Sequence, residues 1–171
     1  NTYATPTNTT TLTLRKVVNN TTGSNGTAVP TDWFLEAIGQ TPGVAGPDGD
    51  PKITRTPVLP GNYDIFESEV VGYTGQWSCS KNGGTAVAAG SIGIAARGSV
   101  TINQGDDVVC TATNTSNPTI TIKKMCDPSA GNLDKFDIII GNILRGTANC
   151  GAGGAITPPI HLTVAPGDSY N

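Results

Sequence analysis

Residues 11–16 read Thr-Leu-Thr-Leu-Arg-Lys, and residues 119–124 repeat the pattern as Thr-Ile-Thr-Ile-Lys-Lys. Apolar and polar side chains alternate in both stretches, which is the two-residue period of a β-strand with one face in a core. Thr and Val recur along the whole chain, and 22 Gly and 12 Pro interrupt it. This composition favours strands joined by turns over helices, so we predict an all-β protein of antiparallel β-sandwich type.

Two further blocks recur in the same order as the first. The block Asp-Trp-Phe-Leu-Glu-Ala-Ile-Gly at residues 32–39 matches Asp-Lys-Phe-Asp-Ile-Ile-Ile-Gly at 134–141. Later, Leu-Pro-Gly-Asn-Tyr at residues 59–63 resembles Ala-Pro-Gly-Asp-Ser-Tyr at 165–170. Three matched blocks in one order predict two tandem copies of a single fold.

The repeats set the domain organisation that we expect. Residues 1–10 form a polar lead-in or donor segment, residues 11–116 the first β-sandwich, and residues 117–171 a second module. The second copy lacks the counterpart of residues 65–114, so we expect it to be incomplete. A half-sandwich leaves unpaired strand edges, which would have to be covered by other strands.

Charge and composition argue against several classes of protein. The net charge is −3 and the ten Lys and Arg are scattered, whereas nucleic-acid binding needs a clustered basic face. No apolar run approaches the roughly 20 residues of a membrane span. The four Cys form no Cys-x-x-Cys pair and His161 stands alone, so we expect no zinc site and no cofactor.

The alternation also predicts which polar side chains face inward. On the apolar face of three strands the pattern places Lys16, Glu67 and Asn114, although Phe66 competes with its neighbours for the core. The side chains expected to share these inward faces are Leu12, Leu14 and Val18 in the first strand, Tyr63 and Ile65 in the second, and Val108, Cys110 and Ala112 in the third.

A buried amine, carboxyl and carboxamide can be satisfied in two ways. The first is an ion pair of Lys16 and Glu67 that is hydrogen-bonded to Asn114. The second is chemical, because burial lowers the pKa of a lysine and raises that of a carboxyl group. A neutral Lys16 amine could then attack the Asn114 carboxamide while Glu67 relays protons, and an intramolecular isopeptide bond would form as ammonia leaves.

The same residues carry a family resemblance. Leu-Thr-Leu-Arg-Lys ends at Lys16, Tyr-Asp-Ile-Phe-Glu ends at Glu67 ahead of Gly72-Tyr73, and Val-Cys-Thr-Ala-Thr-Asn ends at Asn114. The chain resembles the Cna protein B-type, or SpaA-like, module of bacterial surface proteins and pilins. The resemblance implies a prealbumin-like, immunoglobulin-like sandwich, a Lys16–Asn114 cross-link and a Glu67 proton relay. Val70-Val71 departs from the Pro that often precedes Gly-Tyr in that family.

The cysteines and the second copy complete the candidate sites. Because Cys79 lies two residues after Trp77 and Cys110 faces inward, we favour a Cys79–Cys110 disulfide, with Cys126 and Cys150 paired in the second copy. Four Cys allow three connectivities, so a link between copies stays open. In the second copy Lys124 takes the place of Lys16, with partners expected after Asn171.

Other motifs indicate ordinary structure. Asp48-Gly49-Asp50 and Gly105-Asp106-Asp107 lack the ligand spacing of a calcium loop and are typical of turns. His161 is expected in a strand, and Trp33 and Trp77 in the core or at its rim. We claim no modification at the Asn-x-Thr/Ser triplets, which begin at Asn8, Asn19, Asn20, Asn25 and Asn114.

These observations predict a structural stalk or shaft module of an extracellular bacterial surface protein, pilus or filament. Its partners would be neighbouring modules or copies of itself, and its only chemistry a single-turnover internal reaction, so it would not be an enzyme. One alternative is an adhesive module for a host protein or glycan, with residues 40–57 as its variable loop. Another is a filament subunit completed by strand donation, for example of residues 1–10.

Overall fold

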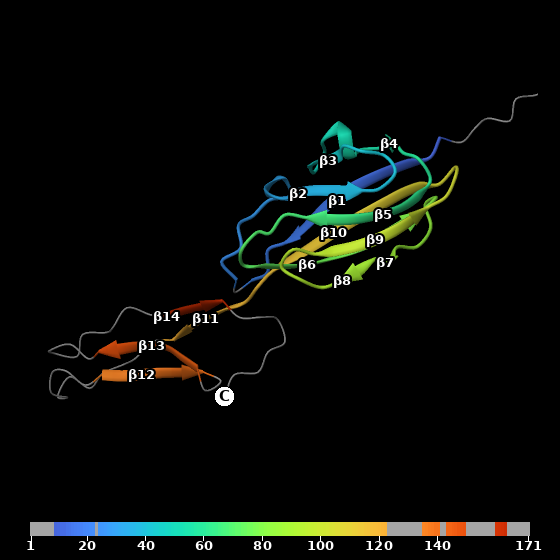
Figure 1. The fold of residues 1–171 in the computed structure, drawn as a ribbon. Helices are drawn as coiled ribbons and strands as arrows, with labels where there is room; N and C mark the ends of the chain where they lie inside the picture. Colours follow the sequence, from blue (N-terminus) through green and yellow to red (C-terminus); the bar gives the residue numbers. More distant parts are fainter. Residues whose placement is uncertain (1–8, 23, 123–134, 141–142, 150–159, 164–171) are drawn as a thin grey trace, which may run out of the picture. The chain divides into compact units, whose positions relative to one another are not determined.

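The computed structural model describes residues 9–22, 24–122, 135–140, 143–149 and 160–163 (Figure 1). The chain divides into two compact units, one ending at Ser116 and the next beginning at Asn117. Each unit is described by itself.

The first unit contains ten strands and two short 3₁₀ turns among its described residues. In chain order they are β1 (Thr11–Asn19), η1 (Pro30–Asp32), β2 (Phe34–Ile38), β3 (Val44–Pro47), η2 (Pro51–Ile53), β4 (Thr56–Pro57), β5 (Gly61–Glu67), β6 (Tyr73–Lys81), β7 (Val87–Ala88), β8 (Gly90–Ser91), β9 (Arg97–Ile102) and β10 (Asp107–Ser116).

These strands form two five-stranded sheets, ordered β4-β1-β10-β6-β7 and β3-β2-β5-β9-β8 (Figure 1). The alternating patterns explain the layering, because the longer strands such as β1, β5, β6 and β10 turn their apolar faces toward the other sheet. The largest fully buried side chains between the sheets include Trp33, Trp77 and Tyr63. The unit is a β-sandwich, as the sequence predicted.

The first and last strands of the unit run side by side. β1 pairs with β10 in parallel, with Lys16 opposite Ala112 and Val18 opposite Asn114. The prediction of an antiparallel sandwich is therefore wrong for this one pair, while the other ladders of the unit are antiparallel. Alternation shows which face a strand buries, but it does not show the direction of its neighbour.

The outer face of β1 is also partly covered. Thr11 and Thr13, which share a face with Arg15, are 6% and 8% exposed. The Thr13 hydroxyl accepts a hydrogen bond from the Arg55 backbone N–H (3.0 Å), and Thr11 donates to Asp107. The cover comes from the segment of η2 and β4. Residues 40–57, the candidate variable loop of the adhesive alternative, contain β3, η2 and β4.

The second unit contains β11 (Thr119–Ile122), β12 (Lys135–Ile140), β13 (Ile143–Asn149) and β14 (Ile160–Thr163) among its described residues. β11 pairs antiparallel with β14, with Thr119 opposite Thr163. In the first unit Thr11 stands opposite Pro57 in the same way. Likewise the antiparallel β12–β13 hairpin corresponds to the antiparallel β2–β3 hairpin of the first unit. These pairings support the repeat, while the incompleteness of the second module stays a prediction.

Candidate functional site: a buried amine, carboxyl and carboxamide

Lys16 lies near the end of β1 with its side chain inside the sandwich. Its Nζ is 2.5 Å from Glu67 Oε2, and both side chains are 0% exposed. The Nζ also lies over the Trp33 ring, 4.2 Å from the ring centroid. Burial lowers the pKa of Lys16 below its usual range, against the opposing effect of the hydrogen bond and charge of Glu67. The amine is thus held in a dry, aromatic-walled site beside one carboxyl group.

Glu67 is the last residue of β5, in the opposite sheet from Lys16. Its Oε1 accepts hydrogen bonds from Asn114 Nδ2 (2.9 Å) and from the backbone N–H of Ala96 (3.3 Å). Ala96 is itself held by Trp77, whose indole N–H donates to the Ala96 carbonyl (3.0 Å). Glu67 therefore connects the amine on β1 with the carboxamide on β10.

Asn114 lies on the inward face of β10 and is 0% exposed. Its Nδ2 donates to Glu67, whereas its Oδ1 has no hydrogen-bond partner among the described residues. A buried carbonyl oxygen without a donor is costly and therefore calls for an explanation. The carbonyl is therefore free to accept a proton or a donor when charge develops on it.

The structure thus brings together the three residues that the sequence singled out, with the carboxyl group between the other two. The sequence reasoning missed Trp33 as the ring beside the amine and Ala96 as a donor to Glu67. Their contacts depend on loops whose path no local pattern predicts.

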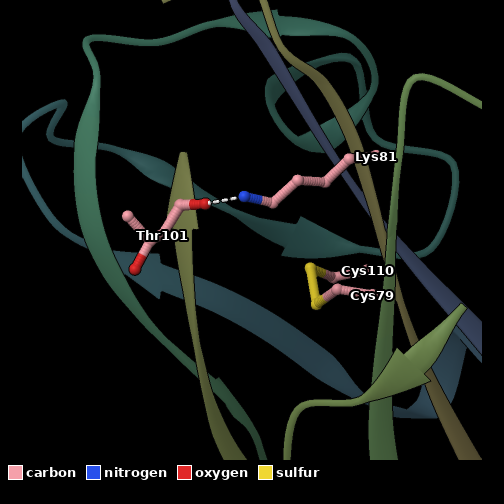
Figure 2. The surroundings of a disulfide bond; sticks show 4 residues. All are labelled: Cys79, Lys81, Thr101 and Cys110. Atoms are coloured by element: carbon pink, nitrogen blue, oxygen red, sulfur yellow. Dashed lines mark hydrogen bonds between the residues drawn. A yellow bond between two sulfur atoms is a disulfide. The ribbon is translucent and has the colours of Figure 1, made fainter. Parts of the chain in front are cut away.

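The Cys79–Cys110 disulfide is present in the first unit (Figure 2). The two cysteines stand directly opposite each other on β6 and β10, with Cα atoms 4.1 Å apart. Near the bond, the Lys81 ammonium donates to the Thr101 carbonyl of the facing sheet. Cys126, Cys150 and Lys124 lie outside the described residues, so the second disulfide and the second lysine site stay predictions.

The acidic turns have structural roles. Asp48 accepts a hydrogen bond from the Lys16 backbone N–H (2.8 Å), and Asp50 accepts one from the Lys52 N–H (2.8 Å). Asp106 accepts a hydrogen bond from the Asn103 N–H (2.9 Å). Within the described ranges no three His, Cys, Asp or Glu side chains gather as a metal site. His161 lies in β14.

No helix in the described part of the chain has the length and apolarity needed to cross a membrane.

Comparison with protein families agrees with this architecture. A family model described as a prealbumin-like fold domain, of the SpaA type, matches residues 7–112. Among solved structures, the chain is similar to the major pilin of Streptococcus pyogenes, solved as an asparagine-to-alanine mutant, with 20% identity and a TM-score of 0.35. That match covers 64% of this chain and 48% of the pilin, so the chain spans about half of its length. No curated protein sequence matches the chain.

The two facing sheets define a class, the β-sandwich whose first and last strands are neighbours. The chain belongs to the SpaA-type prealbumin-like fold domain family, whose model covers more than half of its residues.

Proposed function

We propose that the first unit is a load-bearing stalk module of an extracellular surface protein or filament, closed by a Lys16–Asn114 isopeptide bond. The observation that carries the proposal is the buried cluster, in which Glu67 contacts Lys16 Nζ at 2.5 Å and Asn114 Nδ2 at 2.9 Å. A structural ion pair would satisfy Lys16 and Glu67, but it leaves the Asn114 carbonyl oxygen without a donor. A reaction at that carbonyl gives the oxygen a role.

The reaction begins with a proton shift inside the cluster. The proton moves from Lys16 Nζ to Glu67 Oε2, which leaves a neutral amine and a neutral acid in a site where burial disfavours both charges. The lone pair of Nζ attacks Asn114 Cγ, and Glu67 gives its proton to the carboxamide as negative charge develops on Oδ1.

The second half of the reaction replaces one amide by another. Glu67 takes a proton from Nζ and passes it to Nδ2, the bond between Cγ and Nδ2 breaks, and Nδ2 leaves as ammonia. As the carbonyl re-forms, Oδ1 returns its proton to Glu67, which ends the reaction as a neutral acid. One C–N bond forms and one breaks, so the reaction needs no oxidant and no cofactor. Folding supplies the proximity that an enzyme would otherwise provide, and each chain reacts once.

The position of the proposed Lys16–Asn114 bond suits it to carry a pulling force. β1 and β10 carry the two ends of the module, and they are parallel neighbours. A pull that enters at β1 would cross through Lys16 and Asn114 and leave at the end of β10. The Cys79–Cys110 disulfide supports an oxidising, extracellular location, where neighbouring modules or copies of the chain would be the partners.

Intact-mass measurement tests the proposal directly. We expect the wild-type chain to weigh less than its calculated mass by one ammonia after reduction, and proteolysis to give a branched peptide joining β1 to β10. Lys16→Ala, Glu67→Ala and Asn114→Ala should each restore the full mass. Lys52→Ala, which changes an exposed lysine in η2, should not. A wild-type chain that shows its full calculated mass, with no loss of ammonia, would refute the cross-link.

A further inference from the structure

Gly75 faces the Asn114 carboxamide from the neighbouring strand. It lies on β6 directly opposite Asn114 on β10, and both residues point into the sandwich. Cys79 and Cys110 occupy the same kind of position on this ladder, with Cα atoms 4.1 Å apart. Such a spacing is typical of non-hydrogen-bonded pairs, in which opposed side chains come closest. Asn114 therefore projects into space that a side chain at position 75 would need.

The space beside Gly75 is filled by the carboxamide itself. A Cβ atom built on Gly75 would lie 1.9 Å from Asn114 Oδ1, 2.4 Å from Cγ and 2.7 Å from Nδ2. The three nearest atoms all belong to the proposed acceptor group, and no Cβ tolerates such distances. Any residue other than glycine at position 75 would have to move the carboxamide.

The backbone at Gly75 has little freedom to make way. Its N–H donates to the Gly93 carbonyl (2.8 Å), and its carbonyl accepts from the Gly93 N–H (3.0 Å). The backbone is therefore held on the side away from β10, while Asn114 is held by Glu67 at 2.9 Å. The weaker of these two constraints is the single hydrogen bond of the carboxamide, so the carboxamide would move.

We propose that Gly75 is a positioning residue for the cross-linking reaction, providing the notch that seats the Asn114 carboxamide against Glu67. This inference rests on the proposed function and adds a determinant of whether a module can react. A module with the lysine, the glutamate and the asparagine, but with a side chain opposite the asparagine, would hold its acceptor out of place.

Gly75→Ala and Gly93→Ala form a matched pair for the first test. Both add one methyl group to the Gly75–Gly93 bridge, but a Cβ at Gly93 meets only the Ala95 carbonyl, at 4.0 Å. Chains made by cell-free synthesis are quenched at intervals, and the fraction that has lost ammonia is read by intact mass. We expect Gly93→Ala to react at the wild-type rate and Gly75→Ala to be slower by on the order of 100-fold.

A second measurement separates positioning from general damage. In a background that cannot react, Lys16→Met with Glu67→Gln, Gly75→Ala should lower the urea midpoint while Asn114 is present. When Asn114→Ala is added, the loss of stability caused by Gly75→Ala should shrink to that of Gly93→Ala, because the three nearest atoms in the clash belong to the carboxamide. If Gly75→Ala fails to fold beside Asn114 but folds beside Asn114→Ala, the notch is supported.

The outcomes distinguish this inference from the function on which it rests. If the wild type loses ammonia and Gly75→Ala reacts at the same rate, the positioning role is overturned and the cross-link stands. If the wild type keeps its ammonia, the cross-link fails, while the stability cycle still decides whether Gly75 seats the carboxamide. If Gly75→Ala lowers the urea midpoint equally with and without the Asn114 side chain, the proposal that Gly75 seats the carboxamide is overturned.

Discussion

Strand β10 takes part in two cross-strand connections, a disulfide at Cys110 and a buried polar cluster at Asn114, and they differ in kind. Cys110 is joined to Cys79 across one ladder, within the sheet that contains both residues. Asn114, four residues later on the same inward face, meets a cluster that spans both sheets, with Lys16 on β1 and Glu67 on β5. The first tie is a bond between neighbours, and the second is an assembly of three strands.

The difference teaches where each tie acts. The disulfide closes the segment between positions 79 and 110, which lies inside the stretch from 16 to 114. If the Lys16–Asn114 bond forms, a pull on the two ends never reaches the disulfide. The disulfide would then stabilise the fold at rest, and the polar cluster would carry the load. Four experiments can break or sharpen this division.

The largest expected effect is mechanical. Pulled from its ends in a single-molecule experiment, the wild-type module should show no unfolding extension, because residues 17–113 are bypassed by the cross-link. Asn114→Ala under reducing conditions should release on the order of 300 Å of chain, at roughly 3.3–3.6 Å per residue. A wild-type module that extends by the same length would end the idea of a load-bearing tie.

The second effect concerns the buried charges. In an Asn114→Ala background, where no cross-link can form, Lys16→Met should lower the free energy of unfolding by about 3–5 kcal/mol, because Glu67 is left buried without its cation. Changing both residues, Lys16→Met with Glu67→Met, should recover most of that loss. The measurement is urea unfolding. A single change that costs no more than the double would show that the cluster is more wetted than its 0% exposure indicates.

The third effect concerns the disulfide. Cys79→Ala with Cys110→Ala should lower the free energy of unfolding by about 2–4 kcal/mol, mainly because the unfolded chain gains freedom. Ammonia loss should proceed as in the wild type, since the hydrogen bonds that join Lys16, Glu67 and Asn114 do not involve the cysteines. Guanidinium unfolding and intact mass test both statements. If ammonia loss stops in this variant, the two ties depend on each other.

The smallest effect is a pH dependence. Burial lowers the pKa of Lys16 from its ordinary 10.5, so between the two values the unfolded chain binds more protons than the folded one. The unfolding free energy of the uncross-linked Asn114→Ala protein should therefore rise as the pH approaches 10.5. Adding Lys16→Met should remove that rise. Equal slopes in the two proteins, compared by urea midpoints at alkaline pH, would contradict the shift.

Much of this fold could be predicted from local sequence. Alternation indicated that Leu12, Leu14 and Lys16 share one face of β1, because the two-residue period is fixed by strand geometry. The burial of Thr11 and Thr13 could not be predicted in this way, since it depends on a segment some 40 residues away that folds over them. The parallel pairing of β1 with β10 is likewise a tertiary outcome.

Some residues of the candidate site could be predicted from local sequence, and others could not. Lys16, Glu67 and Asn114 stand out because polar groups interrupt apolar faces, which a sequence displays. Gly75 was within reach, since a glycine inside a strand often marks a close approach of another group. Ala96 contributes its backbone N–H to Glu67 and its carbonyl to Trp77, and an alanine gives no signal of these backbone roles.

The parallel arrangement of β1 and β10 has a consequence for architecture. The chain enters this unit at Thr11 and leaves it near Ser116, so it passes once from end to end instead of doubling back. A ten-residue strand such as β10 spans roughly 33 Å. Each added copy of such a unit would thus lengthen a chain of tandem units by a fixed increment. The number of duplicated copies would then set the distance between the two ends of that chain.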